Sequence, residues 1–351
     1  MINKQHSATT FAILAAALYA LNVPFSKILL QHTSPTMMAA FLYLGAGLGL
    51  LACRLVGQRL GRSSAAPPLT KKELPYTIAM VVLDIAAPIL LMLGVERTTS
   101  ASVSLLNNFE IVVTSLIALV IFGETLSRRL WAAIGLVTVA SAILGWEGGG
   151  LAFNQGSLLV LGACACWGLE NNCTKMLSGK SSVEIVTIKG CFSGLGSLVV
   201  ALLLGERLPP AGWLPAILLL GFVSYGLSIN FYILAQRELG AAKTSAYYSI
   251  APFLGVAFSM LLLGERPGAR FYVALVIMAA STWLMARDSI KLQHTHIHTH
   301  LHTHEHRHGG LIHTHQHAHV HTHLHIHGEN EEDHGHPHRD LTGHQHSHCI
   351  H

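Results

Sequence analysis

The chain contains one pattern twice, as RTTSASVSLLNNFEIVVTSLIALVIFGE at Arg97–Glu124 and RELGAAKTSAYYSIAPFLGVAFSMLLLGE at Arg237–Glu265. Each copy begins with an arginine and small residues, continues as an apolar stretch of membrane-spanning length, and ends at Gly-Glu. A weaker repeat pairs Tyr19–Lys27 with Trp167–Lys175. Duplicated bundles of membrane helices are typical of secondary transporters, in which the two halves face each other across a central site.

The composition is that of an integral membrane protein, with 51% hydrophobic and 11% charged residues. A hydrocarbon core about 30 Å thick is crossed by about 20 apolar residues in a helix. Because five helices per repeat is an odd number, the second copy must insert upside down relative to the first. We therefore expect an all-α polytopic membrane protein, with ten transmembrane helices as two inverted five-helix repeats and a disordered tail. The predicted spans are residues 9–30, 35–56, 74–93, 100–122, 130–146, 156–177, 183–204, 214–236, 241–263 and 271–286.

Three parts follow from these spans: a first repeat at residues 1–146, a second repeat at 156–286, and a histidine-rich tail at 287–351. Lys and Arg in loops and at helix ends gather on the side of the N-terminus, which predicts that both termini are cytoplasmic and that the protein lies in the cytoplasmic (inner) membrane. The opposite side of the membrane holds fewer of them, namely Lys27, Arg97, Arg207, Arg266 and Arg270. The sequence leaves open whether the protein forms a homodimer.

The repeats carry short motifs of a known family. Asn22, Pro24, Phe25 and Lys27 form an Asn-x-Pro-Phe-x-Lys element that ends the first span, and Gly-Glu closes the fourth and the ninth. Together with the two five-helix halves, these motifs resemble the drug/metabolite transporter superfamily of the EamA type over residues 9–286. The resemblance implies a ten-helix secondary transporter with a central cavity between the repeats, commonly an exporter of small metabolites or amino acids.

Ionisable side chains inside the predicted spans are the first functional candidates, because at the bilayer midplane they need a cavity or a partner. Glu110 is the strongest, since it lies near the centre of the fourth span with Asn107 one turn before it. Burial favours the neutral form of a carboxyl group, so we expect Glu110 to bind substrate and a proton alternately. The alternative is a buried structural hydrogen bond. The predicted substrate and coupling-ion residues are Glu110, Asp84, Asn107, Asn22, Glu170, Asn230 and Tyr248.

Three further groups have a structural alternative beside the functional one. Cys166, Glu170 and Cys173 share a helix face and could hold a soft divalent metal, although coincidence is the better explanation. Glu124 and Glu265 are expected to be structural, since a carboxylate is favourable at the start of a following helix. The prolines could break their helices or only kink them, and they are Pro24, Pro88 and Pro252.

The tail holds 23 of the 25 histidines, almost all at every second position. It has little apolar sequence to bury, so we expect disorder in the absence of metal. Neutral imidazole is a good ligand for zinc, nickel, cobalt and copper. The tail could collect metal for export, sense it, buffer it, or respond to pH. The predicted ligands are His294, His296, His298, His300, His302, His304, His313, His315, His317, His319, His321 and His323.

The leading functional hypothesis is a proton-driven exporter of a small polar metabolite with metal-linked physiology, whose partners are the lipid bilayer, its solute and metal ions at the tail. The second is direct efflux of a divalent metal such as Zn, Ni or Co. The third is a metal sensor or store that transports nothing. We find no nucleotide-binding loop, nucleophile elbow or HExxH motif, so we expect neither an enzyme nor a required cofactor, and no nucleic-acid partner.

Overall fold

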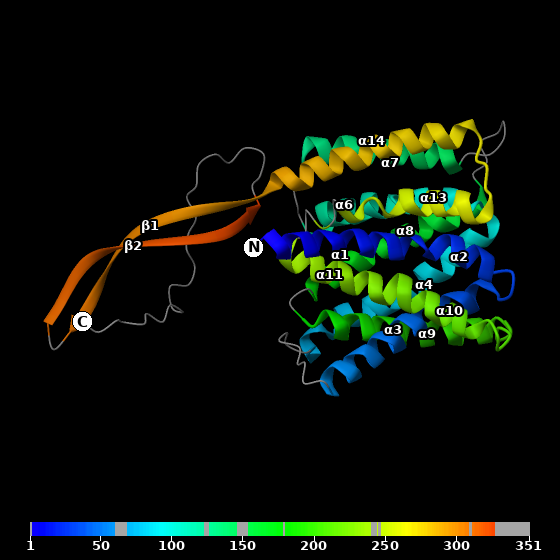
Figure 1. The fold of residues 1–351 in the computed structure, drawn as a ribbon, viewed down its shortest axis with the longest axis horizontal. Coiled ribbons are helices and arrows are strands. Elements are labelled where there is room, and N and C mark those ends of the chain that lie inside the picture. The colour runs from blue at the N-terminus through cyan, green and yellow to red at the C-terminus, as the bar shows by residue number, and fades with distance from the viewer. Residues whose placement is uncertain are drawn as a thin grey trace. The chain divides into compact units, whose positions relative to one another are not determined.

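The computed structural model describes residues 2–59, 69–122, 126–145, 154–177, 180–239, 244, 247–308 and 311–326. The chain divides into two compact units, Met1–Lys291 and Leu292–His351, here called the membrane unit and the tail unit. Helices make up the membrane unit (Figure 1). They are α1 (Ile2–Ala20), α2 (Asn22–Leu29), α3 (Pro35–Arg59), the 3-10 turn η1 (Lys71–Glu73), α4 (Leu74–Arg97), α5 (Ser100–Leu106), α6 (Phe109–Phe122), α7 (Arg128–Gly145), α8 (Gln155–Met176), α9 (Ser182–Leu203), α10 (Leu214–Gly221), the π-helical segment η2 (Phe222–Leu227), α11 (Ser228–Leu239), α13 (Ala251–Leu263) and α14 (Ala269–Leu292).

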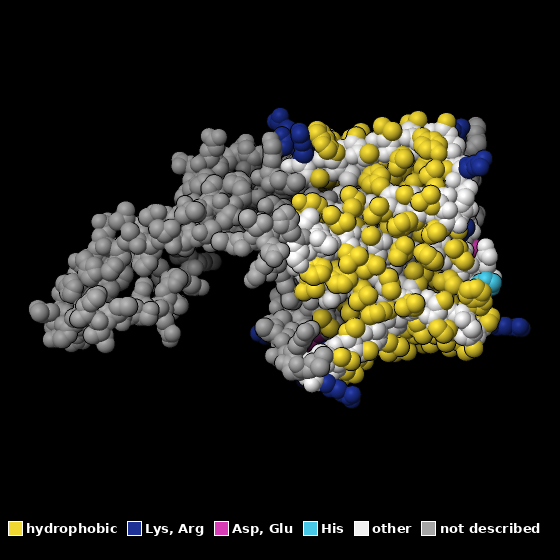
Figure 2. All heavy atoms as spheres, viewed as in Figure 1, with side chains coloured by type: hydrophobic (Ala, Val, Ile, Leu, Met, Phe, Trp, Pro, Cys, Tyr) yellow, Lys and Arg dark blue, Asp and Glu magenta, His cyan; other side chains and the backbone are white. Residues whose placement is uncertain are grey.

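The surface of the membrane unit fits a bilayer. Eight of the described helical spans are long and apolar enough to cross a membrane, and α13 is a shorter apolar helix. The remaining long helix, α8, carries Glu170, Asn171 and Asn172 in its second half. Figure 2 shows apolar side chains over the middle of the visible face, with Lys and Arg at its two ends. Such a surface is unfavourable in water and favourable in lipid.

Contacts between the two halves follow the sequence repeat. The second helices of the repeats, α3 and α9, pack on each other, as do the fourth helices, α5 and α13. The fifth helices, α7 and α14, share one apolar cluster. The pair α4 and α8 has its counterpart in α11 and α1. Exchange of the two repeats therefore maps these contacts onto one another, and the predicted all-α fold of two inverted five-helix repeats is confirmed.

Glycines bring the repeats into backbone contact between α3 and α9. A Cβ atom on Gly47 would lie 2.4 Å from the backbone nitrogen of Cys191, and one on Gly190 would lie 2.4 Å from that of Gly47. Helices in lipid have no hydrophobic driving force toward each other, so such close approach through small residues supplies the packing energy. The interface between the repeats depends on these glycines.

Prolines lie beside two interruptions of the predicted spans. The first span is broken at Leu21, between α1 and α2, three residues before Pro24. A proline ring excludes the carbonyl oxygen one turn earlier, which accounts for this break. In the ninth span, α13 begins at Ala251, directly before Pro252. Pro88 differs, because α4 continues through it.

The fourth span is broken without a proline, between α5 and α6. Asn108 donates its side-chain amide to the carbonyl of Leu105 at 3.1 Å, which competes with helical bonding of the backbone. The carbonyl oxygens of Leu106 and Asn107 lie 3.7 and 3.9 Å from the thiol sulfur of Cys164. Side chains of Asn108 and Cys164 therefore supply donors to the backbone carbonyls at the break, in the interior of the bundle.

Lys27, the last residue of the Asn-x-Pro-Phe-x-Lys element, caps the C-terminal end of α4. Its ammonium group donates to the backbone carbonyls of Val95, Glu96 and Thr98, at 3.0 Å to Glu96 and 2.8 Å to Thr98. These carbonyls belong to the last turn of α4 and the residue after it. A cation is favourable there because it compensates the negative end of the helix dipole.

Two glutamates that follow helices of the second repeat cap helices of the first. Glu265 accepts hydrogen bonds from the backbone amides of Ser100 and Ala101, each at 2.8 Å, at the start of α5. Glu206 accepts one from a backbone amide in the first turn of α3 at 2.7 Å. The structural role expected for Glu265 agrees with this geometry. Glu124 lies outside the described residues.

The tail unit contains a two-stranded antiparallel ladder of β1 (Gln293–His308) and β2 (Leu311–Ile326). Its register places histidine opposite histidine, as in the pairs His298–His321 and His300–His319. The structure thus shows paired strands over residues 293–308 and 311–326, in a tail whose low apolar content predicts disorder in the absence of metal. Alternation with period two and the interleaved Thr, Ile, Leu and Val residues favour extended backbone.

We predict that Glu265→Ala lowers the thermal stability of the purified protein, because two backbone amides at the start of α5 lose their acceptor. The expected loss is about 1 kcal/mol, typical of a helix cap. Glu265→Gln should lose less, since its amide oxygen still accepts one bond. The matched control is Glu96→Ala, which removes an exposed carboxylate from a helix C-terminus. Equal melting temperatures for Glu265→Ala and the control would contradict the assigned role.

Candidate functional site

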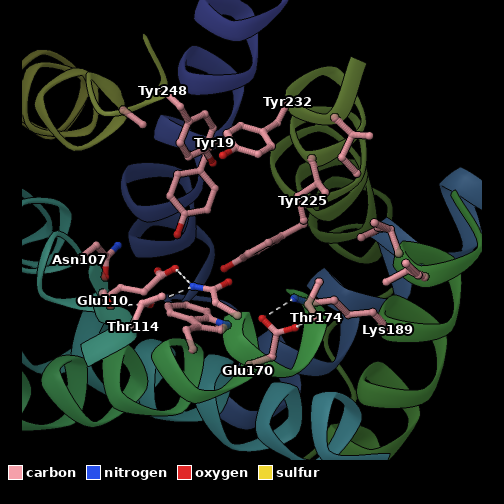
Figure 3. A pocket seen from close by; sticks show the side chains of 18 of the residues that line it. Tyr19, Asn107, Glu110, Thr114, Glu170, Thr174, Lys189, Tyr225, Tyr232 and Tyr248 are labelled. Atoms are coloured by element: carbon pink, nitrogen blue, oxygen red, sulfur yellow. Dashed lines mark hydrogen bonds and ion pairs between the residues drawn. The ribbon is translucent and has the colours of Figure 1, made fainter. Parts of the chain in front are cut away.

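A cavity of about 660 Å³ lies inside the membrane unit. Its walls come from α1, α3, the break after α5, and α6 of the first repeat, and from α8, α9, η2, α11 and the start of α13 of the second. Figure 3 shows side chains from these elements pointing into one shared space. The volume is in the usual range for small-molecule sites, about 300–1,000 Å³.

The cavity occupies one half of the bundle. Its lining runs from Asn107 and Tyr248, beside the helix breaks, to Lys180 and Ser182, where α8 has ended and α9 begins. Among the described residues, none of its lining comes from the opposite end, where Lys27 and the two glutamate caps lie. The cavity is therefore one-sided.

Lys189 lines the cavity and connects two buried carboxylates. Its ammonium nitrogen lies 3.0 Å from Asp84 Oδ2 and 3.0 Å from Glu170 Oε2. The side chain of Asp84 is 0% exposed and that of Glu170 is 1% exposed. The three residues come from α9, α4 and α8, so the charges tie helices of both repeats together. A charge inside a membrane protein requires such partners.

Neutral hydrogen bonds complete this cluster. Tyr43 donates its hydroxyl to Asp84 Oδ1 at 3.0 Å, and Trp167 Nε1 donates to the Tyr43 oxygen at 3.3 Å. The hydroxyl of Thr174 donates to Glu170 Oε1. Both oxygens of each carboxylate are thus engaged, which holds their orientation.

Glu110 has a different environment. It lies in the first turn of α6, directly after the helix break, and lines the cavity. Asn171 donates its side-chain amide to Glu110 Oε1 at 2.6 Å. Within the described part of the chain, Glu110 forms no ion pair. Its side-chain partner is therefore a neutral amide rather than a cation.

Five tyrosines form a continuous wall. The ring centroids are separated by 5.2 Å for Tyr43 and Tyr225, 6.0 Å for Tyr225 and Tyr19, 5.9 Å for Tyr19 and Tyr248, and 5.0 Å for Tyr248 and Tyr232. All five line the cavity. In Figure 3 the hydroxyls of Tyr19 and Tyr225 point toward the Glu110 side. Tyr225 belongs to η2, and a π-helical turn inside a helix is frequent at functional sites.

The structure brings together most of the residues that the sequence predicts. Glu110, Asn107, Glu170 and Tyr248 line the cavity, and Asp84 lies behind it, paired with Lys189. Asn22 supports the wall, since its amide donates to the Tyr225 hydroxyl at 2.8 Å. Asn230 lies on α11 but does not belong to the lining.

Sequence reasoning missed Lys189, Asn171 and most of the tyrosines. Lys189 is an ionisable residue inside the predicted span 183–204, so the criterion that selects Glu110 could have found it. Tyr19, Tyr43 and Tyr225 carry no comparable signal, because tyrosine is common in membrane helices without a functional role.

The metal site considered at Cys166, Glu170 and Cys173 finds no support in the membrane unit. Across the residues that the structure describes, no group of three or more His, Cys, Asp or Glu side chains is placed to hold a metal ion. Glu170 instead binds Lys189 and Thr174. The tail histidines lie outside the described side chains, so the metal prediction for them is independent of this result.

We predict that Lys189→Met strongly destabilises the protein, because two buried carboxylates lose their shared counter-charge. Removal of one partner from a buried pair costs about 3–5 kcal/mol. Asp84→Asn should cost less, since Lys189 keeps Glu170. Thermal unfolding of the purified protein measures both, with Lys180→Met as a control at the partly exposed ion pair with Glu73. A melting temperature for Lys189→Met equal to that of Lys180→Met would exclude a structural role for the cluster.

Comparison with known proteins agrees with this architecture. The model of the EamA-like transporter family matches residues 6–146 and again residues 154–287. A protein of Methanothermobacter thermautotrophicus, described as an uncharacterized transporter, is 25% identical over 288 residues, which cover 78% of this chain and 84% of that protein. A crystal structure of a protein with 15% sequence identity matches with a TM-score of 0.60, covering 82% of this chain and 98% of the other, and shares the fold. Since the family model covers both halves of the membrane unit, the chain belongs to the EamA-like transporter family.

Proposed function

We propose that this protein is a proton-coupled secondary transporter that exports a small polar or amino-acid-like solute, with metal-linked regulation or buffering by its histidine-rich tail. The observation that carries the proposal is a one-sided cavity between two inverted repeats, with Glu110 on its wall. Transporters built from inverted repeats bind solute between the repeats and expose the site to each side in turn. A one-sided cavity is the form expected for one of these two states.

The distribution of Lys and Arg supports cytoplasmic termini in an inner membrane. In that orientation the end of the bundle where α8 ends and α9 begins faces the cytoplasm. The cavity then opens inward, as an exporter needs when it takes up its solute. The proposed division is a first repeat at residues 1–146, a second at 156–286 and a cytoplasmic tail at 287–351.

Glu110 is the proposed coupling residue because its environment differs from that of the other buried carboxylates. Asp84 and Glu170 share the ammonium group of Lys189 and have their counter-charge in place. Glu110 has a neutral amide as partner, so a proton or a bound solute can neutralise it. Neutralisation lowers the cost of closing the cavity around Glu110 away from water, whereas the bare carboxylate opposes closure. Because a proton and the solute compete for Glu110, the flux of protons is coupled to the flux of solute.

Metal binding by the tail is supported by the spacing of histidines and by the backbone register. Strand residues two apart lie on one face, and the ladder pairs histidine with histidine along both strands. Neighbouring imidazoles on one face suit Zn, Ni, Co or Cu. The paired positions are His294–His325, His296–His323, His298–His321, His300–His319, His302–His317, His304–His315 and His306–His313.

We predict that Glu110→Gln abolishes proton-coupled transport without loss of protein. The assay uses proteoliposomes that enclose a pH-sensitive dye, with a panel of amino acids and small amines added as solutes. Wild-type protein should move protons in response to at least one solute, and Glu110→Gln should not. Glu96→Gln makes the same chemical change at an exposed position and should behave as the wild type. Normal proton movement by Glu110→Gln would refute the coupling role.

We predict that the full chain binds several zinc or nickel ions and that a chain ending at Gln293 binds none with comparable affinity. Calorimetric titration of both purified proteins with each metal measures the stoichiometry, and a chelator should reverse binding. Equal metal binding by the two proteins would refute the tail as the metal site. Proton flux by the shortened chain, with and without metal, then shows whether the tail regulates transport.

A further inference from the structure

We infer that the cavity recognises an organic amine in its ammonium form. This inference rests on the proposed function and specifies its solute. It combines three observations on the same cavity: an excess of carboxylates, a wall of tyrosines, and an unpaired buried acceptor.

The first observation is the charge balance. Asp84, Glu110 and Glu170 lie in or directly behind the cavity, against the single ammonium group of Lys189 among the described residues there. Lys180 lies at the mouth and pairs with Glu73 at 3.3 Å. A cationic solute beside Glu110 reduces this imbalance, whereas an anionic solute increases it. Burial in a membrane makes that difference large.

The second observation is the tyrosine wall. A cation is attracted to the face of an aromatic ring, most strongly where water is excluded. Tyr19, Tyr225, Tyr232 and Tyr248 line the same space as Glu110. Figure 3 shows the hydroxyls of Tyr19 and Tyr225 pointing toward the part of the cavity where Glu110 lies. Aromatic rings that line a buried site bind ammonium groups in other proteins.

The third observation is Asn107. Its side chain is 8% exposed and lines the cavity, and its Oδ1 atom has no hydrogen-bond partner among the described residues. A buried acceptor without a donor is unfavourable, so a ligand that donates there gains affinity. A protonated amine supplies donors and positive charge and carries no acceptor that would need a partner.

The test uses four probes that share one aromatic ring: phenethylamine, phenethyl alcohol, hydrocinnamate and phenylalanine. Calorimetric titration of the purified full chain at neutral pH measures their affinities. We expect phenethylamine to bind at least about tenfold more tightly than the neutral alcohol, in line with an ion-paired cation on aromatic faces. Hydrocinnamate should bind most weakly. Tighter binding of phenylalanine or hydrocinnamate than of phenethylamine would overturn the inference.

Variants separate charge recognition from packing. Glu110→Gln should weaken the binding of phenethylamine by about tenfold or more, while the affinity for phenethyl alcohol changes little. Tyr248→Phe keeps the ring and should retain amine binding, whereas Tyr248→Leu should lose it. Glu96→Gln serves as the matched control. Equal losses of amine and alcohol in Glu110→Gln and Tyr248→Leu would mean that these residues only shape the cavity, and the inference would fall.

The proteoliposome assay distinguishes failure of the inference from failure of the proposed function. If protons move with a neutral or acidic solute and not with phenethylamine, the protein is a proton-coupled transporter and the amine specificity is wrong. If phenethylamine binds as expected but moves no protons, the recognition stands and the coupling proposal fails.

Discussion

The ion cluster of Lys189, Asp84 and Glu170 is the interaction on which the interior of this protein depends. It places one positive charge between two negative charges where lipid surrounds the bundle, and it joins α4 of the first repeat to α8 and α9 of the second. The surrounding hydrogen bonds of Tyr43 and Thr174 fix both carboxylates. Because each of these buried charges has a partner, the bundle can hold a polar cavity beside them without the cost of an unpaired ion.

The neighbouring Glu110 gains its distinct character from this arrangement. Because Lys189 is occupied by two carboxylates, the third has an amide of Asn171 as its partner. The sequence repeat explains why Glu110 has no twin. Where the first repeat has Asn107 and Glu110, the second has Tyr248 and Ala251 at the matching positions. The break in the helix is kept in both repeats, whereas the side chains beside it differ, so a symmetric scaffold carries an asymmetric site.

Much of the fold could be predicted from the sequence, and less of the site. Hydropathy and the repeat identified the spans because the bilayer imposes a length on every helix, as the close agreement of 183–204 with Ser182–Leu203 illustrates. Glu110 and Asp84 were visible as charges in apolar sequence. The ion pairs of Lys189 were not visible, because they depend on which helices pack together, and these helices are far apart in the chain. The break at Asn107 lacked a proline, and the π-helical turn that presents Tyr225 leaves no mark in the sequence.

The capped end of the bundle has a consequence for motion. Glu206 and Glu265 belong to the second repeat, and the amides they bind begin α3 and α5 of the first. If the repeats rock against each other to open the cavity at that end, these contacts are the ones that must separate, and each glutamate must then regain water. In such a motion, the separation of these contacts would contribute to the barrier between the two orientations. Substitutions far from the solute would then change the rate of turnover while leaving affinity untouched.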